Sequence, residues 1–178
     1  MPSTRIAVVG FMGSGKSTVG PALAMRLGME FVDLDDAVED VDGRTIPEIF
    51  DQDGEEGFRS VESMVLRENL EGPPSVISTG GGIVESADNR KLLVTGTQVV
   101  WLDARFETLR VRLAAGLART PRPLVERLGW DGLRQLHRRR RPLYAACAHY
   151  RFDTDRDAPV RVSRRIEGAL RAAEEEPS

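Results

Sequence analysis

One nine-residue segment near the start of the chain constrains its fold more than any other feature. Residues 10–18 read GFMGSGKST, which matches the pattern G-x-x-x-x-G-K-S/T of a phosphate-binding loop, or P-loop. The preceding residues 5–9 are a β-rich apolar run, and residues 19–27 carry apolar side chains at helical spacing before Gly28. A strand, a glycine loop and a helix in this order present backbone N–H groups and a helix N-terminus to an anion. The segment therefore predicts a nucleotide-binding α/β protein.

Lysine is rare in this chain, and one lysine occupies the key position of the P-loop. Of 25 lysines and arginines, only Lys16 and Lys91 are lysines. An ammonium at position 16 reaches the β- and γ-phosphates of a nucleotide, and the Ser17 hydroxyl is expected to bind the Mg²⁺ that bridges them. The loop residues expected to bind the nucleotide are Gly13, Ser14, Gly15, Lys16, Ser17 and Thr18.

Size and composition are those of an ordinary globular protein. The 178 residues are 40% apolar and 30% charged with a net charge of −3, so we expect a single domain over residues 1–173 and a disordered tail over 174–178. One cysteine excludes an internal disulfide and a cysteine-based zinc site. The chain has no apolar run of membrane-spanning length, and we expect no signal peptide, since the first strand is predicted to begin at residue 5. We expect a cytoplasmic monomer that binds neither membranes nor nucleic acid.

The rest of the chain alternates short apolar strands with helical segments. Beyond residues 5–9, strands are expected at 30–35, 75–78, 98–102 and 150–153. Helices are expected, beyond 19–27, at 45–50, 54–70, 86–94, 106–117, 131–148 and 159–173, the first of these opened by a Thr45–Glu48 capping box. This alternation predicts a three-layer α/β/α fold around a five-stranded parallel sheet, with ligands at the carboxyl ends of the strands.

Three further features suit the chemistry of phosphoryl transfer. Asp33 and Asp35 lie two apart at the predicted end of the second strand, so both carboxylates are expected on one face, one toward Mg²⁺ and one toward a substrate hydroxyl. The alternative is a polar exit from the strand. Residues 80–82 are three consecutive glycines, which suit a loop that passes close to a substrate, or a flexible turn. Arginines at 59, 122 and 140 can grip a carboxylate or phosphate, although a run such as 138–141 is also typical of a solvated basic helix.

Together these motifs resemble the shikimate kinase family over nearly the whole chain. The residues that carry the resemblance are the P-loop, Asp33 and Asp35, the pattern G-E-x-x-F-R-x-x-E at 54–62, Gly80–Gly82, R-P-L at 122–124 and R-R-P-L-Y at 140–144. The resemblance implies a P-loop fold of the nucleoside-monophosphate-kinase type, with a shikimate-binding segment at about 33–62 and a mobile lid at about 112–126. It also implies transfer of the ATP γ-phosphoryl group to the 3-hydroxyl of shikimate, a step toward chorismate and the aromatic amino acids.

The resemblance also implies roles in an acceptor pocket. Asp35 would hold the accepting hydroxyl and assist its deprotonation, while Arg59 and Arg140 would bind the shikimate carboxylate. The other residues implied in this pocket are Gly80, Gly81 and Gly82 along its wall, Glu62 orienting the arginines, and Phe50 and Phe58 against the ring.

On the nucleotide side, the resemblance implies that Lys16 and Arg122 stabilise the transferred phosphoryl group. Ser17 would bind Mg²⁺ directly and Asp33 through water. Either Arg112 or Arg119 would be the arginine that contacts the nucleotide, and both remain open. Residues 152–159, including Pro159, resemble an adenine-binding loop, with Ala158 where the family commonly has an amide side chain.

Two other functions remain as alternatives. A gluconate kinase or a nucleoside-monophosphate kinase shares the loop and the topology, but neither explains Arg59 and Gly80–Gly82 together with Asp35. A catalytically silent relative would bind nucleotide without phosphoryl transfer, but such relatives usually lose a residue that is equivalent to Lys16, Asp35 or Arg122.

Overall fold

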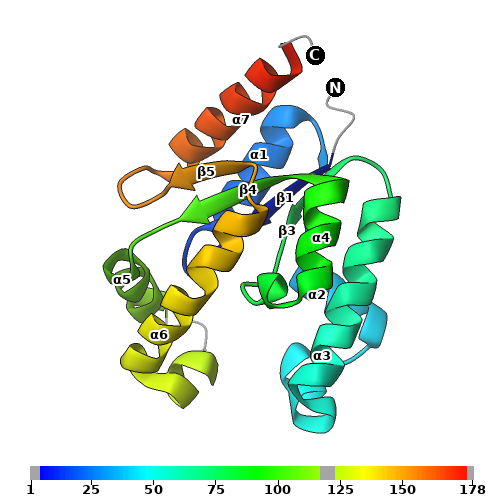
Figure 1. Cartoon of the computed structure of the whole chain (residues 1–178), viewed down its shortest axis with the longest axis vertical. Helices are drawn as coiled ribbons and strands as arrows, with labels where there is room; N and C mark the ends of the chain where they lie inside the picture. The colour runs from blue at the N-terminus through cyan, green and yellow to red at the C-terminus, as the bar shows by residue number, and fades with distance from the viewer. Residues whose placement is uncertain (1–4, 117–122, 176–178) are drawn as a thin grey trace.

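The computed structural model describes residues 5–116 and 123–175, and within these ranges five parallel strands form one sheet (Figure 1). The strands are β1 (Arg5–Val9), β2 (Glu30–Asp33), β3 (Ser75–Ser78), β4 (Thr97–Asp103) and β5 (Tyr150–Asp153). Their spatial order is β2-β3-β1-β4-β5, which puts the strand before the P-loop at the centre. Ala7 of β1 pairs with Ile77 on one side and Val99 on the other. The predicted five-stranded parallel sheet is therefore confirmed.

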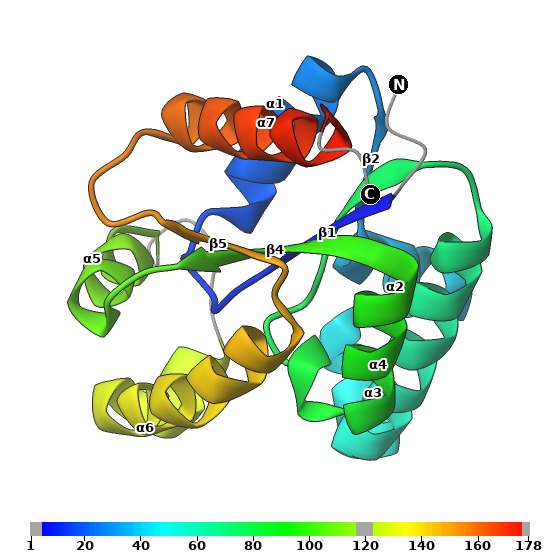
Figure 2. The same ribbon diagram turned by 45° about the horizontal axis from the view of Figure 1, so that its top comes forward.

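Helices cover both faces of this sheet. They are α1 (Lys16–Leu27), α2 (Leu34–Asp42), α3 (Ile46–Glu71), α4 (Ala87–Gly96), α5 (Phe106–Gly116), α6 (Pro123–Cys147) and α7 (Pro159–Glu175), with the short 3₁₀ helix η1 (Ile83–Glu85). Helices α1 and α7 lie on one face, and α3, α4 and α6 lie on the other (Figure 2). Alternate residues of β1 serve the two faces, because Ile6 and Val8 belong to the core under α1 and α7, whereas Ala7 and Val9 belong to the opposite core. This is the predicted three-layer arrangement.

The capping box predicted at Thr45 is present. The Thr45 side chain accepts a hydrogen bond from the Glu48 backbone N–H, and Glu48 accepts one from the backbone N–H of Thr45 at 2.8 Å. The predicted helices at 45–50 and 54–70 are the two parts of α3, which changes direction at Gly54. Helix α6 changes direction in the same way at Gly129.

Three predicted boundaries are wrong. The second strand ends at Asp33 rather than residue 35, because the Asp33 side chain caps α2, a helix that is not among those expected from the sequence. Helix α6 begins at Pro123 rather than residue 131, since proline suits the first helical position and Gly129 accommodates a bend within the helix. Helix α7 continues to Glu175, into the predicted tail. Residues 117–122 of the predicted lid lie outside the described ranges, so the lid stays a prediction.

Among the described residues, no helix has both the length and the apolar character that crossing a membrane requires.

Candidate active site

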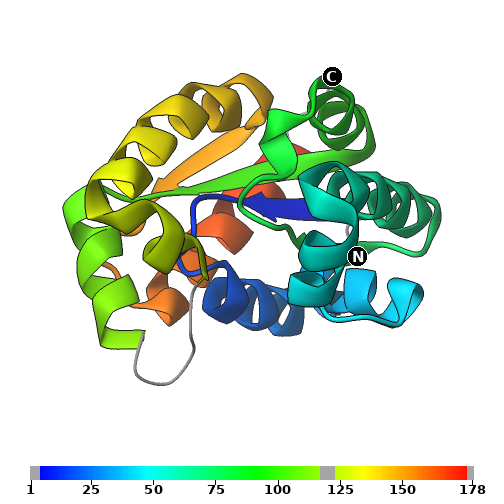
Figure 3. The same ribbon diagram turned by 90° about the horizontal axis from the view of Figure 1, so that it is seen from below.

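The carboxyl ends of the strands open into a cleft with a volume of about 1600 Å³. In Figure 3 the P-loop lies between α6 and the N-terminal part of α3, and residues of all three line the cleft. The predicted site residues in its lining are Gly13, Ser14, Gly15, Lys16, Ser17, Thr18, Asp33, Asp35, Phe50, Phe58, Arg59, Glu62, Gly80, Gly81, Gly82, Arg112, Arg140 and Pro159. The remaining one, Arg122, lies outside the described residues. Residues from seven separate stretches of the chain therefore share one cleft.

The P-loop has the donors that a polyphosphate requires. Lys16 Nζ donates hydrogen bonds to the carbonyl oxygens of Gly10, at 2.8 Å, and Phe11, at 3.2 Å. The buried Ser14 hydroxyl has no hydrogen-bond partner among the described residues. A buried polar atom without a partner costs free energy, so this hydroxyl suits a ligand that brings an acceptor into the loop. Ser17 and Asp33 line the same cleft, and their side chains carry oxygen atoms, the ligands that Mg²⁺ prefers.

The acidic pair is arranged differently from the prediction. Asp33 is the N-cap of α2, and its Oδ1 accepts a hydrogen bond from the backbone N–H of Asp35 at 3.0 Å. Asp35 consequently lies in the first turn of a helix and not on a strand, although both residues line the cleft. Burial raises the pKa of the Asp35 carboxyl, the Asp33 charge raises it further, and Lys16 opposes the shift. Burial likewise raises the pKa of Asp33. A carboxylate whose pKa is raised toward neutrality is a better proton acceptor.

On the α3 side, a buried carboxylate holds an arginine. Arg59 Nη1 donates to Glu62 Oε2 at 2.6 Å, and the Arg59 guanidinium lies 5.1 Å from the centre of the Phe58 ring. Burial raises the pKa of Glu62, with the Arg59 charge acting against it. Phe58 in turn stacks on Phe50 with ring centres 4.7 Å apart. The pair of rings forms an apolar wall beside a fixed cation.

The three glycines after β3 pack against these charged groups. A Cβ on Gly80 would lie 2.8 Å from Glu62 Oε1 and 3.0 Å from Asp35 Oδ1. A Cβ on Gly82 would lie only 2.1 Å from Arg59 Nη2. The glycines therefore leave room for the functional side chains themselves, and this feature cannot be read from the sequence.

Arg140 approaches the same turn from α6. Its Nη1 lies 3.8 Å from the position that a Cβ on Gly81 would take, and the guanidinium lies 5.9 Å from the centre of the Phe11 ring. Arg140 Nε donates to Glu85 Oε1 at 3.0 Å. Tyr144, one helical turn further on, donates its hydroxyl hydrogen to the Gly81 carbonyl. Glu85 was absent from the sequence predictions, because no motif marks it and its partner is 55 residues away.

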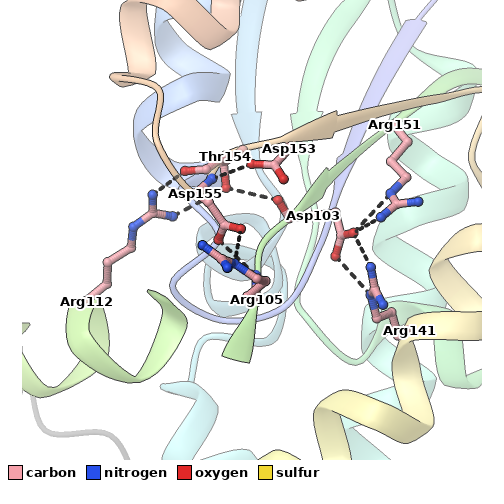
Figure 4. Close-up of polar contacts among 8 residues, drawn as sticks. All are labelled: Asp103, Arg105, Arg112, Arg141, Arg151, Asp153, Thr154 and Asp155. Carbon is pink, nitrogen blue, oxygen red and sulfur yellow. Dashed lines mark hydrogen bonds and ion pairs between the residues drawn. The ribbon is translucent and has the colours of Figure 1, made fainter. Parts of the chain in front are cut away.

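On the nucleotide side, Arg112 of α5 hydrogen-bonds to Thr154 (Figure 4), and both residues also contact the P-loop. The Arg112 guanidinium donates to the Gly13 carbonyl at 3.3 Å and to the backbone carbonyl of Thr154. The buried Thr154 hydroxyl donates to the Ser14 carbonyl at 3.2 Å. Sequence reasoning missed Thr154, although it lies in the stretch 152–159 that resembles an adenine-binding loop. Arg119, the alternative to Arg112, lies outside the described residues.

A protein-family model and curated sequences both relate this chain to shikimate kinases. The family model described as shikimate kinase matches residues 12–171. The chain is 49% identical over 155 residues to a shikimate kinase of Symbiobacterium thermophilum, covering 85% of this chain and 87% of the relative. It is 44% identical over 168 residues to a shikimate kinase of Moorella thermoacetica, covering 94% and 95%.

Solved structures of shikimate kinases also resemble this chain. The structure of a shikimate kinase from Acinetobacter baumannii in complex with shikimate superposes with a TM-score of 0.88 at 36% identity, covering 98% of this chain and 97% of that one. A gluconokinase from Sinorhizobium meliloti superposes with a TM-score of 0.62 at 19% identity, over 97% of this chain and 94% of that one. At that identity the second likeness shows a shared fold alone.

Proposed function

Because the chain belongs to the shikimate kinase family, we propose that its cleft binds shikimate against α3 and α6 and ATP against the P-loop. The protein is an ATP-dependent kinase that phosphorylates a hydroxyl group of shikimate, a reaction of aromatic amino acid biosynthesis. We propose that the acceptor is the 3-hydroxyl of shikimate and that individual residues have the following roles.

Arg59 and Arg140 bind the shikimate carboxylate. Planar guanidinium groups suit a carboxylate because each can donate two parallel hydrogen bonds. Both arginines lie beside Gly81 and Gly82, so an anion above this turn meets both cations. The stacked Phe50 and Phe58 rings offer an apolar surface to the carbon ring of the substrate.

Asp35 accepts the hydrogen bond of the 3-hydroxyl and takes its proton as the oxygen attacks the γ-phosphorus. The raised pKa of Asp35 suits this role, since it increases the affinity of the carboxylate for a proton. Lys16 and Arg122 donate hydrogen bonds to the phosphoryl oxygens and stabilise the charge that develops on them. The γ-phosphoryl group moves to the acceptor oxygen as its bond to the ADP oxygen breaks.

Mg²⁺, when bound, would offset the negative charge of the nucleotide phosphates. Ser17 through its hydroxyl and Asp33 through a water molecule are the residues that would hold it. Arg112 and Pro159 bind the nucleotide at the far end of the cleft, where Arg112 already connects the P-loop to Thr154. We further propose that the enzyme works as a cytoplasmic monomer.

The observation that carries this proposal is that the P-loop lysine, Asp35 and the two arginines share one cleft. A coupled assay of ADP release with shikimate, gluconate and AMP as acceptors tests it. We expect turnover with shikimate alone. Turnover with gluconate or AMP but not with shikimate would overturn it, and nucleotide binding without any phosphoryl transfer at saturating Mg²⁺ would favour a catalytically silent protein.

A further inference from the structure

The Arg140 guanidinium has a carboxylate partner that lies outside the sequence motifs described above. Glu85 Oε1 accepts a hydrogen bond from Arg140 Nε at 3.0 Å and another from Arg139 Nη2 at 2.7 Å. Glu85 and both arginines line the cleft. The arrangement matches that of Arg59, the other arginine beside the glycine turn, whose Nη1 lies 2.6 Å from Glu62 Oε2. Arg59 and Arg140 are therefore each paired with a carboxylate, Glu62 of α3 for Arg59 and Glu85 of η1 for Arg140.

We propose that Glu85 is a positioning residue, which orients the Arg140 guanidinium so that Arg140 can bind the carboxylate of shikimate. This inference rests on the proposed function, because it presupposes that Arg140 binds that carboxylate. Glu85 itself does not contact the substrate in this proposal. It acts through the hydrogen bond at Nε, as Glu62 acts through Arg59.

The backbone around Glu85 is well suited to hold a side chain in place. Ile83 and Val84, the two preceding residues of η1, are fully buried. The Glu85 backbone N–H donates to the Gly82 carbonyl at 3.0 Å. Arg90 of α4 donates to the carbonyl oxygens of Val84, at 2.5 Å, and Glu85, at 3.2 Å. Glu85 thus projects from a turn that is fixed from both sides, next to the glycines of the acceptor pocket.

The geometry of a guanidinium explains why one hydrogen bond at Nε matters. Its five N–H groups lie in one plane, so a partner at Nε fixes that plane and directs the terminal Nη atoms. The side chain of Arg140 is only 7% exposed, and its Nη1 faces Gly81. An arginine that is oriented before binding loses less side-chain entropy when the substrate arrives.

The negative charge of Glu85 has a second effect, which opposes the binding of an anion by Arg140. An experiment must separate this effect from the positioning of Arg140. Burial pushes the pKa of Glu85 upward, but hydrogen bonds and charges from Arg140 and Arg139 outweigh it and hold the pKa below its usual value. The ionised carboxylate partly neutralises Arg140 and so weakens its attraction for an anion. Both arginines donate to the same oxygen, Oε1, so a glutamine can keep both hydrogen bonds while losing the charge.

The test compares Glu85→Ala with Glu85→Gln in steady-state kinetics. We expect Glu85→Ala to raise KM for shikimate about tenfold, as expected for the loss of a hydrogen bond to a charged group, and to change KM for ATP by less than about twofold. Glu85→Gln should stay within about threefold of the wild type, because the acceptor oxygen remains. Calorimetric titration with shikimate should show the same order of affinities.

Glu107→Ala is the matched control. Glu107 also pairs with an arginine of α6, Arg134, at 2.7 Å, but neither residue lines the cleft. We expect its kinetics to match the wild type. Thermal melting of every variant separates a loss of folding from a loss of binding.

Three outcomes would overturn the inference. The first is an unchanged KM for shikimate in Glu85→Ala. The second is a lower KM in both Glu85 variants, which would show that the charge competes with the substrate. The third is an equal loss of affinity for shikimate and ATP together with a lower Tm, which would show a general structural role. Failure of the proposed function is seen separately, as absence of shikimate-dependent ADP release by the wild type.

Discussion

At the scale of single residues, the glycines after β3 show how much depends on the absence of a side chain. Gly82 leaves the space that the Arg59 guanidinium occupies, with Nη2 only 2.1 Å from the position of an added Cβ. Gly81 has more room, since the nearest atoms to its added Cβ are 3.6 Å away. A methyl group at Gly82 would therefore displace the Arg59 guanidinium, whereas a methyl group at Gly81 would make only ordinary van der Waals contacts.

We predict that Gly82→Ala weakens shikimate binding by displacing the Arg59 guanidinium. A charge-assisted hydrogen bond contributes about 1.5–3 kcal/mol, so KM for shikimate should rise by about tenfold or more while KM for ATP stays nearly constant. Steady-state kinetics with each substrate varied in turn measures both. Gly168→Ala in α7 is the control, because its added Cβ meets no atom within 4 Å and alanine favours a helix. A wild-type KM for shikimate in Gly82→Ala would contradict the role of Arg59.

The two lysines of the chain provide a second matched pair. Lys16→Ala should lower kcat by about a thousandfold or more, because phosphoryl transfer depends on stabilising charge on the phosphoryl oxygens. Lys91, exposed on α4, carries the same charge away from the cleft, so Lys91→Ala should leave kcat unchanged. The coupled ADP-release assay measures both, and circular dichroism checks that each variant is folded. A kcat within tenfold of the wild type for Lys16→Ala would remove Lys16 from its proposed role.

At the scale of elements, local patterns predicted most of the fold. The strand at 5–9, the P-loop and the Thr45 capping box are signals contained within a few adjacent residues, and the structure has all three. Helix α2 was missed although its own signal is present: Asp33 in the capping position, followed by Asp35 and Asp36 in the first turn. The spacing Asp33-x-Asp35 also fits the two-residue period of a strand, which is why the sequence predicts a strand up to residue 35.

The parts of the site that sequence could not predict are contacts between elements. Glu85 meets Arg140 across 55 residues, and Thr154 meets Ser14 across 140. Neither contact is marked by a local sequence pattern, because each depends on how the sheet arranges elements that are far apart in the chain. The order β2-β3-β1-β4-β5 brings them together. Motif residues could therefore be named from the sequence, but their supporting residues could not.

The bend in α3 provides a prediction at this scale. Gly54 has φ +70° and ψ −171°, a conformation that is essentially restricted to glycine. It separates the segment that carries Phe50 from the segment that carries Phe58 and Arg59, so the bend sets how these side chains meet in the cleft. Gly54→Ala should cost about 1–3 kcal/mol of stability and raise KM for shikimate. Urea unfolding and steady-state kinetics measure the two effects.

The added methyl group at Gly54 would meet no atom within 4 Å, so any loss arises from the backbone and not from a clash. Gly168→Ala serves again as the control, since that glycine already has a helical environment. A Gly54→Ala variant as stable as the wild type would show that α3 can straighten without cost.

At the scale of the whole molecule, the cleft concentrates carboxyl groups that burial makes costly to ionise. Burial raises the pKa values of Asp33, Asp35 and Glu62. A carboxyl group whose pKa is higher in the folded state stabilises the fold at low pH, and this contribution is lost as the pH rises through the folded pKa. As the pH rises through these folded pKa values, ionisation of the cleft carboxyl groups therefore works against the stability of the fold, a common relation between activity and stability.

Asp35→Asn tests this relation directly. Asparagine does not titrate, so the variant should gain stability relative to the wild type as the pH rises above 3.8, the ordinary pKa of an aspartate, and through the raised pKa of Asp35. The Asp33 cap is kept, because Asp33 accepts from the backbone N–H of residue 35. We expect a higher Tm than the wild type at pH 7, about 2–4 °C for each kcal/mol gained, and a smaller difference at pH 4. The same substitution should lower kcat by about a hundredfold or more, since it removes the proposed proton acceptor.

Asp40→Asn, at an exposed position of the same helix, is the control for the loss of one negative charge. Its Tm difference from the wild type should be the same at both pH values, because no cleft carboxylate is removed. Differential scanning calorimetry at pH 4 and pH 7 provides all four comparisons. If Asp35→Asn lowers Tm by the same amount at both pH values, the buried charge of Asp35 does not destabilise the fold. Loss of activity with a gain in stability at pH 7 would instead show that Asp35 is kept for its chemistry, since the fold is more stable without its charge.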